Sequence, residues 1–320
     1  ADLTKLTGAE ILRHSVGLEG SALAGGLSVT GTGWATELLA KATEVAGTEP
    51  TARPEGFHGE LRAYQADALA WLGFLDAAEL GGCLALDMGL GKTPTMLAHL
   101  GRTAGTGTAL VVAPPAVVGN WAREAARFTP ELRVVVHHGA NRAEGMALSR
   151  AIEKADVVIT TYGTAVRDVE ELTKVEWARL VLDEAQVIKN PQNETSQQLR
   201  RLSARSRIAL TGTPIENGLG DLWAILDFCN PGLVGPRPQF IAQLAGEGEA
   251  ALKALNGLLV FRRTKSEPDV AAALPDRIDE LDHCMMTTEQ IGLYQAVLDG
   301  LVADANADID VPERRTAMRE

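Results

Sequence analysis

Residues 83–94 read CLALDMGLGKTP, and this stretch decides the fold class. Cys83 to Asp87 is a short, mostly apolar run that predicts a buried strand, and an amphipathic helical pattern begins near Pro94. Gly89 and Gly91 lie between the two, where they leave backbone N–H groups open to an anion, and the helix N-terminus adds partial positive charge. A strand, a glycine-rich turn and a helix in this order predict a loop that binds a phosphate chain.

The candidate phosphate-binding loop also carries the side chains that such a site needs. Its residues are Met88, Gly89, Leu90, Gly91, Lys92 and Thr93. We expect Lys92 to reach the outer phosphates of a nucleotide and the Thr93 hydroxyl to ligate Mg²⁺. The complete pattern would place glycine at position 86, where this chain has Leu86. A plain strand-to-helix turn therefore stays open as the alternative.

Short β-branched runs alternate with helix-length amphipathic stretches from residue 57 onward. The predicted strands are Cys83 to Asp87, Ala109 to Ala113, Arg133 to His138, Val157 to Thr161, Leu180 to Asp183 and Ile208 to Thr211. The predicted helices lie near 93–103, 117–128, 141–153, 163–172, 193–204, 219–230 and 241–259. This alternation predicts an α/β fold, in which a mostly parallel sheet is covered by helices on both faces and followed by a helical extension.

A pair of carboxylates follows one of the predicted strands. Leu180 to Asp183 is apolar until its last residue, and Glu184 comes directly after it. The carboxyl ends of parallel strands line one edge of a sheet, so we expect Asp183 and Lys92 to face a common ligand. Asp183 is the candidate for holding Mg²⁺, and Glu184 is the candidate base that orients and deprotonates an attacking water. Acids that merely cap the following helix or loop are the alternative.

A third polar segment, Thr211-Gly212-Thr213, lies at the end of the last predicted strand. Hydroxyl groups and a glycine at that position suit a sensor of the γ-phosphate. The same residues also form ordinary turns, so this segment alone does not distinguish the two.

Composition excludes several classes of protein. With 46% hydrophobic and 22% charged residues, the chain has enough apolar side chains for a folded core. No apolar run reaches the ~20 residues of a membrane helix and no export signal is visible, so we expect a cytoplasmic protein with no membrane partner. The three cysteines, Cys83, Cys229 and Cys284, lie far apart and predict buried thiols rather than a disulfide framework or a zinc site.

The formal net charge of −12 is distributed unevenly. Residues 101–220 carry 15 basic and 13 acidic side chains, whereas residues 221–320 carry 9 and 17. The acidic excess is concentrated toward the C-terminal end, so the overall charge does not exclude a phosphate-binding surface in the middle of the chain.

Further motifs occur in an order that is hard to obtain by chance. Before the first predicted strand the chain carries Leu61-Arg62-Ala63-Tyr64-Gln65. Between that strand and the acidic pair it carries Val112-Ala113-Pro114-Pro115, Asn120-Trp121 and Thr160-Thr161-Tyr162. After the pair come Ile188-Lys189-Asn190, 210–217, Asp221-Leu222-Trp223, Asn230-Pro231-Gly232-Leu233, Arg262-Arg263-Thr264-Lys265, Leu274-Pro275 and Glu289-Gln290. Over about residues 57–300 this set closely resembles the first motor lobe of the Swi/Snf family of superfamily-two helicase-like ATPases.

The resemblance implies a RecA-like P-loop lobe that binds ATP with Mg²⁺, and an enzyme that hydrolyses ATP to ADP and phosphate while moving along double-stranded DNA. It implies that Gln65 reads the adenine base. It places Gln186 at the last position of the family's acidic motif. The residues implied to couple the nucleotide site to the rest of the motor are Gln186, Thr211, Gly212 and Thr213.

The resemblance also implies contacts to the DNA backbone. The segments that match such contacts contain Pro114, Thr161, Tyr162, Lys189 and Asn190. Contacts of this kind are mostly to phosphate, so DNA binding is expected to depend on salt and to be indifferent to sequence.

This chain departs from the family pattern in two respects. The family commonly has Asp-Glu-Met-Gly at the loop entrance, whereas this chain has Leu86-Asp87-Met88-Gly89. The family's motor has two RecA-like lobes with ATP between them, and the second lobe supplies the arginines that stabilise the transition state. The second lobe is therefore an expected partner, and this chain alone is expected to be nearly inactive.

The expected organisation has four parts. These are an accessory N-terminal region with a linker at 1–56, the ATP-binding lobe at 57–220, a helical extension at 221–300 and an acidic helical lead into a second lobe at 301–320. The accessory region resembles that of some bacterial members. If the protein is bacterial, we expect it to associate with the nucleoid.

Two other functions remain open on the sequence. One is a nucleotide-dependent docking or regulatory module without turnover. The other is an ATPase whose working partner is a protein cargo, such as RNA polymerase, with DNA only as the track. Lys92, Thr93, Asp183 and Glu184 favour an enzyme, since a module without turnover need not retain all four groups.

Overall fold

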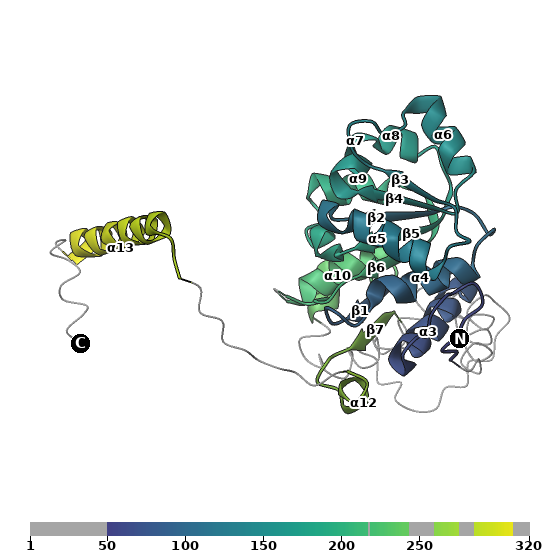
Figure 1. Cartoon of the computed structure of the whole chain (residues 1–320), viewed down its shortest axis with the longest axis horizontal. Coiled ribbons are helices and arrows are strands. Elements are labelled where there is room, and N and C mark those ends of the chain that lie inside the picture. Colours follow the sequence, from purple (N-terminus) through teal and green to yellow (C-terminus); the bar gives the residue numbers. More distant parts are fainter. Residues whose placement is uncertain (1–49, 217, 243–258, 275–284, 310–320) are drawn as a thin grey trace, which may run out of the picture. The chain divides into compact units, whose positions relative to one another are not determined.

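The computed structural model describes residues 50–216, 218–242, 259–274 and 285–309 (Figure 1). The chain divides into two compact units, the first ending at Leu274 and the second beginning at Pro275, and each is described by itself. Residues 1–49, which make up most of the expected accessory region, lie outside the described residues, as does most of the predicted helix at 241–259.

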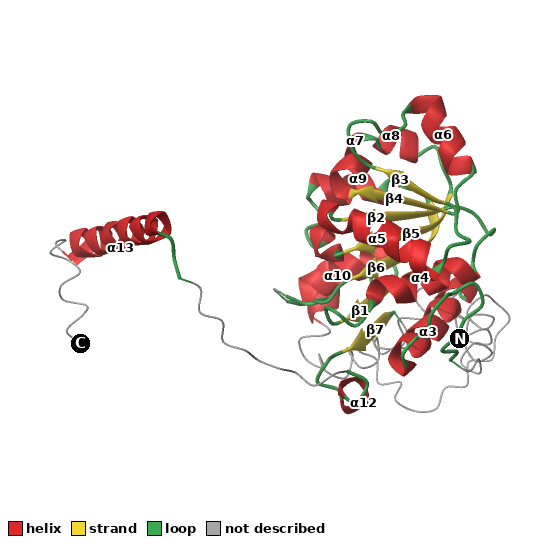
Figure 2. Cartoon of the chain, in the orientation of Figure 1, coloured by secondary structure: helices red, strands yellow, loops and turns green. Residues whose placement is uncertain are grey.

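A single parallel sheet forms the centre of the first unit (Figure 2). The strands that the structure describes lie in the order β3-β4-β2-β5-β6-β1-β7. They are β1 (Gly82–Leu86), β2 (Ala109–Ala113), β3 (Val134–His137), β4 (Val157–Thr161), β5 (Trp177–Asp183), β6 (Ala204–Leu210) and β7 (Val260–Arg263). Each neighbouring pair is parallel, which confirms the predicted fold class and six of the predicted strands.

Helices connect the strands. Those that the structure describes in the first unit are α3 (Ala63–Ala77), α4 (Lys92–Arg102), α5 (Pro115–Phe128), α6 (Gly145–Glu153), α7 (Tyr162–Arg167), α8 (Val169–Leu172), the 3₁₀ turn η1 (Ala185–Ile188), α9 (Glu194–Arg200), α10 (Leu219–Cys229) and α12 (Pro268–Ala271). Helices α4 to α10 lie within or close to the predicted helical stretches, whereas α3, η1 and α12 were not predicted. The stretch at 163–172 forms two short helices because the chain turns at Asp168, whose carboxylate binds His137 and Arg142.

The two faces of the sheet bury two separate cores. Side chains alternate along β1, so that Leu84 and Leu86 face the core beneath α3, α4 and α5, whereas Cys83 and Ala85 face the core beneath α6 to α10. The strands are buried on both sides, and this is why they read as continuous apolar runs. Cys83 and Cys229 are buried free thiols, as predicted; Cys284 lies outside the described residues.

Strand β7 lies in a part of the chain that the sequence predicts to be helical. It has only four residues, pairs with β1 alone and ends in Arg262 and Arg263, whose side chains are half-buried. A run this short carries little periodicity, so its pairing with a strand far away in the sequence decides its conformation. The consequence is that residues 262–265 come to lie beside the end of β1.

The second unit contains the helix α13 (Thr288–Ile309), which coincides with part of the helical pattern expected toward the C-terminal end. Among the described residues of either unit, no helix combines the length and the apolar character that a membrane crossing requires.

Candidate nucleotide-binding site

The loop between β1 and α4 has the backbone shape that a phosphate cradle needs. Gly89 and Gly91 adopt left-handed conformations with φ of 83° and 77°, which favour glycine. Gly91 directly precedes α4, and a Cβ atom there would overlap the Nε2 atom of Gln65. Both glycines are therefore required by the backbone, and the loop leads into the N-terminus of a helix whose free N–H groups favour an anion.

Lys92 and Thr93 open α4 and face the loop. The Lys92 ammonium donates a hydrogen bond to the Leu86 carbonyl at 3.1 Å, so its side chain folds back across the loop. Thr93 is half-buried. Both residues thus lie beside the loop glycines at the start of α4, and their roles toward phosphate and Mg²⁺ stay predictions.

Gln65 connects α3 to the loop. Its Oε1 atom accepts a hydrogen bond from the Arg62 amide at 2.8 Å, and its Nε2 atom donates to the Leu90 carbonyl at 3.1 Å. The side chain is buried, with one N–H and one acceptor position left over. Gln65 thus lies at the phosphate loop, and its reading of an adenine base stays a prediction.

The acidic pair lies at the same edge of the sheet as the loop. Asp183 ends β5 and is 6% exposed, and burial raises the pKa of its carboxyl although the Trp121 hydrogen bond opposes the shift. The Lys92 ammonium is close enough to lower that pKa. The structure therefore brings Asp183 and Lys92 to one site from segments far apart in sequence.

Glu184 adopts a left-handed conformation with φ of 52°, which is unusual for a residue with a side chain. Strain of this kind is retained where the surrounding structure holds it, often at functional sites. Gln186 donates to the Glu184 carboxylate at 2.8 Å and so fixes its position. The strained backbone and the amide together hold the carboxylate beside Asp183 at the end of β5.

A chain of hydrogen bonds leads from Glu184 to the end of β6. The Gln186 amide that holds Glu184 also accepts from the Thr211 hydroxyl at 3.2 Å, and that hydroxyl accepts from the Thr213 amide at 3.1 Å. Gly212 lies against the phosphate loop, since a Cβ atom there would be 3.2 Å from Cγ of Met88. The four residues expected to couple the site to the motor are thus brought together.

The structure adds residues to which the sequence assigned no role. The Asp87 carboxylate forms an ion pair with Arg262 at 2.7 Å and accepts a hydrogen bond from the Lys265 amide at 2.9 Å. Arg262 also donates to the carbonyls of Ala85 and Gly212, at 2.9 and 3.0 Å. The cluster Arg262-Arg263-Thr264-Lys265 was a visible signal, but only the pairing of β7 with β1 shows what it contacts.

The residues expected to contact DNA lie at the carboxyl ends of β2, β4 and β5. Pro114 follows β2 and precedes α5, Thr161 ends β4, and Asn190 follows η1. Asn190 is exposed and Pro114 is half-buried, whereas the Thr161 hydroxyl is buried and accepts from the Thr164 amide at the start of α7. The segments share one edge of the sheet with the nucleotide site.

Two side chains in these segments face inward. Tyr162 is 8% exposed, and its hydroxyl donates to the Asp183 main-chain carbonyl at 2.7 Å. The Lys189 ammonium is bound by Glu216 at 2.8 Å and Asp221 at 3.4 Å, and its side chain is 9% exposed. The Tyr162 hydroxyl is thus engaged inside the protein, whereas the Lys189 ammonium is paired with the exposed Glu216 and with Asp221.

The oxygen groups at the site fit Mg²⁺. A hydroxyl at Thr93 and a carboxylate at Asp183 are hard oxygen donors, and each Asp183 oxygen accepts one protein hydrogen bond, which leaves further lone pairs. Among the described residues, no group of three or more His, Cys, Asp or Glu side chains could hold a metal. Protein sites often bind Mg²⁺ through one or two carboxylates together with substrate phosphates.

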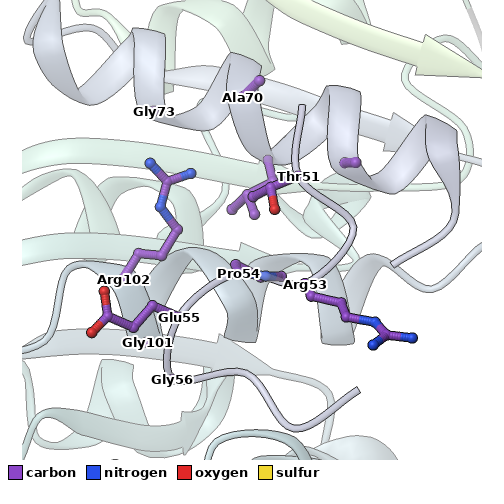
Figure 3. A pocket seen from close by; sticks show the side chains of 11 residues that line it. Thr51, Arg53, Pro54, Glu55, Gly56, Ala70, Gly73, Gly101 and Arg102 are labelled. Carbon is purple, nitrogen blue, oxygen red and sulfur yellow. The ribbon is translucent and has the colours of Figure 1, made fainter. Parts of the chain in front are cut away.

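A pocket of about 580 Å³ lies elsewhere in the first unit (Figure 3). It opens between residues 51–56, α3 and the end of α4, and Arg53, Glu55 and Arg102 line it. Arg102 is the last residue of α4, about 15 Å along the helix from the phosphate loop. The pocket is therefore not part of the nucleotide site.

Comparison with known proteins identifies relatives over most of the chain. The family model described as "SNF2-related domain" matches residues 64–317. The chain is 39% identical over 254 residues to the "Putative ATP-dependent helicase/translocase YwqA" of Bacillus subtilis (strain 168), covering 76% of this chain and 28% of that protein. It is 33% identical over 274 residues to the "ISWI chromatin-remodeling complex ATPase ISW2" of Saccharomyces cerevisiae, covering 81% and 24%.

Solved structures show the same fold. The "Sulfolobus solfataricus SWI2/SNF2 ATPase core in complex with dsDNA" matches with a TM-score of 0.61 and 35% identity, over 81% of this chain and 55% of that one. The SWI2/SNF2 ATPase core domain of the same organism matches with a TM-score of 0.62 and 36% identity, over 81% of this chain and 54% of that one. The chain spans about a quarter of the length of the two curated relatives and about half of these cores.

Proposed function

The chain belongs to the SNF2-related domain family, and from this premise we propose that it is the ATP-binding lobe of an ATPase that translocates along double-stranded DNA. The observation that carries the proposal is the position of the phosphate loop and of Asp183 and Glu184 at one edge of the sheet, where only β6 separates β1 from β5. The matching Sulfolobus solfataricus core is described in complex with double-stranded DNA, which supports the same track for this chain.

Each of the chain's own groups has a task in hydrolysis. The N–H groups of the loop bind the phosphates, and the Lys92 ammonium moves from the Leu86 carbonyl to the outer phosphate. Thr93 and Asp183 hold Mg²⁺, which neutralises phosphate charge when bound. Glu184 accepts the proton of the water that attacks the γ-phosphate, and the Gln186 amide keeps that carboxylate in place.

The hydrogen-bonded chain from Glu184 to Thr213 supports a path by which the state of the γ-phosphate reaches the rest of the lobe. Movement of the Glu184 carboxylate changes the position of Gln186 and then of Thr211. Gly212, the next residue, binds Arg262 through its carbonyl, so the displacement also reaches β7.

DNA contacts are proposed for the exposed Asn190 and for the segments around Pro114 and Thr161. The Thr161 and Tyr162 side chains are themselves buried, and the Lys189 ammonium is paired with Glu216 and Asp221. The transition-state arginines are proposed to come from a second lobe. Loss of such an arginine costs roughly 10³- to 10⁵-fold in rate, so this chain alone is expected to bind ATP but to turn it over slowly.

Two substitutions separate binding from hydrolysis. Lys92→Ala should weaken binding of a fluorescent ATP analogue, because it removes the phosphate contact, while Lys154→Ala, an exposed lysine after α6, serves as the matched control. Glu184→Gln should leave binding unchanged and abolish the duplex-stimulated ATPase rate of the intact protein. Hydrolysis at the parent rate in Glu184→Gln would refute the assignment of the base. Binding without turnover in the unsubstituted protein would instead indicate the docking module.

A further inference from the structure

Asp183 is held by two hydrogen bonds that come from opposite faces of the sheet. Trp121, on α5, donates from its indole Nε1 to the Asp183 Oδ2 atom at 2.8 Å, and it is fully buried in the core beneath α3 to α5. Tyr162, at the start of α7, donates from its hydroxyl to the Asp183 main-chain carbonyl at 2.7 Å and belongs to the other core. The end of β5 is thus fixed from both sides.

Both donors belong to elements that begin at the segments proposed to contact DNA. Trp121 lies seven residues after Pro114, about two turns into α5, and Tyr162 directly follows Thr161 at the end of β4. A displacement of α5 or of the start of α7 by a bound phosphate backbone therefore moves a group that touches Asp183. Trp121 and Tyr162 therefore each connect a segment proposed to contact DNA with Asp183 through one hydrogen bond.

The burial of these groups makes the connection stiff. An indole N–H or a phenol hydroxyl in a dry core is unfavourable without a partner, so Trp121 and Tyr162 cannot move away from Asp183 at little cost.

We propose that Trp121 and Tyr162 are positioning residues that fix Asp183 for Mg²⁺ and transmit the presence of DNA at Pro114 and Thr161 to the nucleotide site. The inference rests on the proposed function, since it requires that the chain bind Mg²⁺ with a nucleotide. The link is reciprocal: DNA that tightens Mg²⁺-nucleotide binding is itself bound more tightly when the nucleotide is present, by the same factor.

The test compares three substitutions in the full chain. Trp121→Phe removes the indole N–H together with part of the ring volume, and Tyr162→Phe removes only the hydroxyl. Trp177→Phe is the matched control, because Trp177 is equally buried and donates to a backbone carbonyl, that of Leu172, at 3.0 Å. Trp177 opens β5 and Asp183 ends it, so about 20 Å of strand separate the control from the site.

The first measurement is a Mg²⁺ titration of fluorescent ADP binding, with unfolding midpoints recorded for each variant. Trp121→Phe should raise the Mg²⁺ concentration at half-saturation about tenfold, as loss of a partner behind a metal ligand typically does, and leave metal-free nucleotide binding unchanged. Trp177→Phe should stay within about twofold of the parent at a comparable loss of stability. In an Asp183→Asn background, Trp121→Phe should produce no further shift.

The second measurement is the ratio of nucleotide affinities with and without duplex DNA. This ratio should fall toward one in Trp121→Phe and Tyr162→Phe and be retained in Trp177→Phe. Equal Mg²⁺ midpoints in Trp121→Phe and Trp177→Phe, or an unchanged DNA ratio in both site variants, would overturn the inference while the parent still binds Mg²⁺ and nucleotide. If Trp121→Phe does not fold, Tyr162→Phe decides the matter alone. A parent chain that binds no Mg²⁺-nucleotide would refute the proposed function and this inference with it.

Discussion

The loop before α4 offers a sharp test of the geometry, because its two left-handed glycines differ in their surroundings. A Cβ atom at Gly89 would meet only the Lys265 side chain, with Nζ at an ordinary contact distance of 3.6 Å. A Cβ atom at Gly91 would overlap Gln65. The substitutions Gly89→Ala and Gly91→Ala therefore share the backbone strain but differ in the clash.

The magnitudes follow from these contacts. A left-handed conformation costs an alanine about 1–2 kcal/mol, and this applies at both positions. In Gly91→Ala the displaced Gln65 also loses its hydrogen bonds to the Arg62 amide and the Leu90 carbonyl, each worth about 0.5–1.5 kcal/mol. We expect the free energy of unfolding to fall by roughly 1–2 kcal/mol in Gly89→Ala and by roughly 2–5 kcal/mol in Gly91→Ala.

The assay is urea denaturation of the full chain followed by far-ultraviolet circular dichroism. Gly119→Ala is the control, because Gly119 lies within α5 with open space around the added methyl group, and alanine there should stabilise by up to about 1 kcal/mol. If Gly91→Ala were no more destabilising than Gly89→Ala, the contact between Gln65 and the loop would be wrong, and with it the position of α3 at the nucleotide site.

Three further predictions concern the rest of the first unit. Burial lowers the pKa of His99, which lies beside Asp76, so the protein takes up a proton on unfolding when the pH is below the unfolded-state pKa of about 6.5. The free energy of unfolding should therefore fall as the pH drops from 7 to 5, by up to about 1.4 kcal/mol per pH unit. Urea titrations of His99→Gln should show a smaller dependence on pH. Burial raises the pKa of Cys83 and raises that of Cys229 to about 12, so iodoacetamide at pH 8 should modify both only in urea, and peptide mass spectrometry showing rapid native labelling would contradict their placement. Arg262→Ala removes an ion pair and two hydrogen bonds to backbone carbonyls and should lower the unfolding free energy by about 2 kcal/mol, whereas an unchanged urea midpoint would mean that β7 does not hold the loop.

Much of the fold could be predicted because its signals are local. The strands that form the middle of the sheet are continuous apolar runs, and Gly89, Gly91 and Lys92 reveal the phosphate loop because only glycine adopts its backbone shape easily. Strand β7 could not be predicted, since four residues have too little periodicity and their pairing with β1 supplies the conformation.

The site was predictable in part for the same reason. Asp183 and Glu184 follow an apolar strand, and the rule that parallel strands end at one edge brings them to Lys92 without any knowledge of contacts. Side-chain direction was not predictable. Tyr162 and Lys189 belong to segments at the expected edge, yet the Tyr162 hydroxyl binds a buried main-chain carbonyl and the Lys189 ammonium is paired with Glu216 and Asp221.

Six of the strands, the phosphate loop and the residues at the carboxyl edge of the sheet follow from local sequence patterns, whereas β7 does not. The contacts of those edge residues depend on the tertiary fold. The ion pair of Asp87 with Arg262 and the hydrogen bonds of Asp183 with Trp121 and Tyr162 join positions that are far apart in the chain. Local periodicity predicts whether a residue is buried but not which residue it contacts. The contacts depend on the order of the strands and on how the helices pack on the two faces of the sheet.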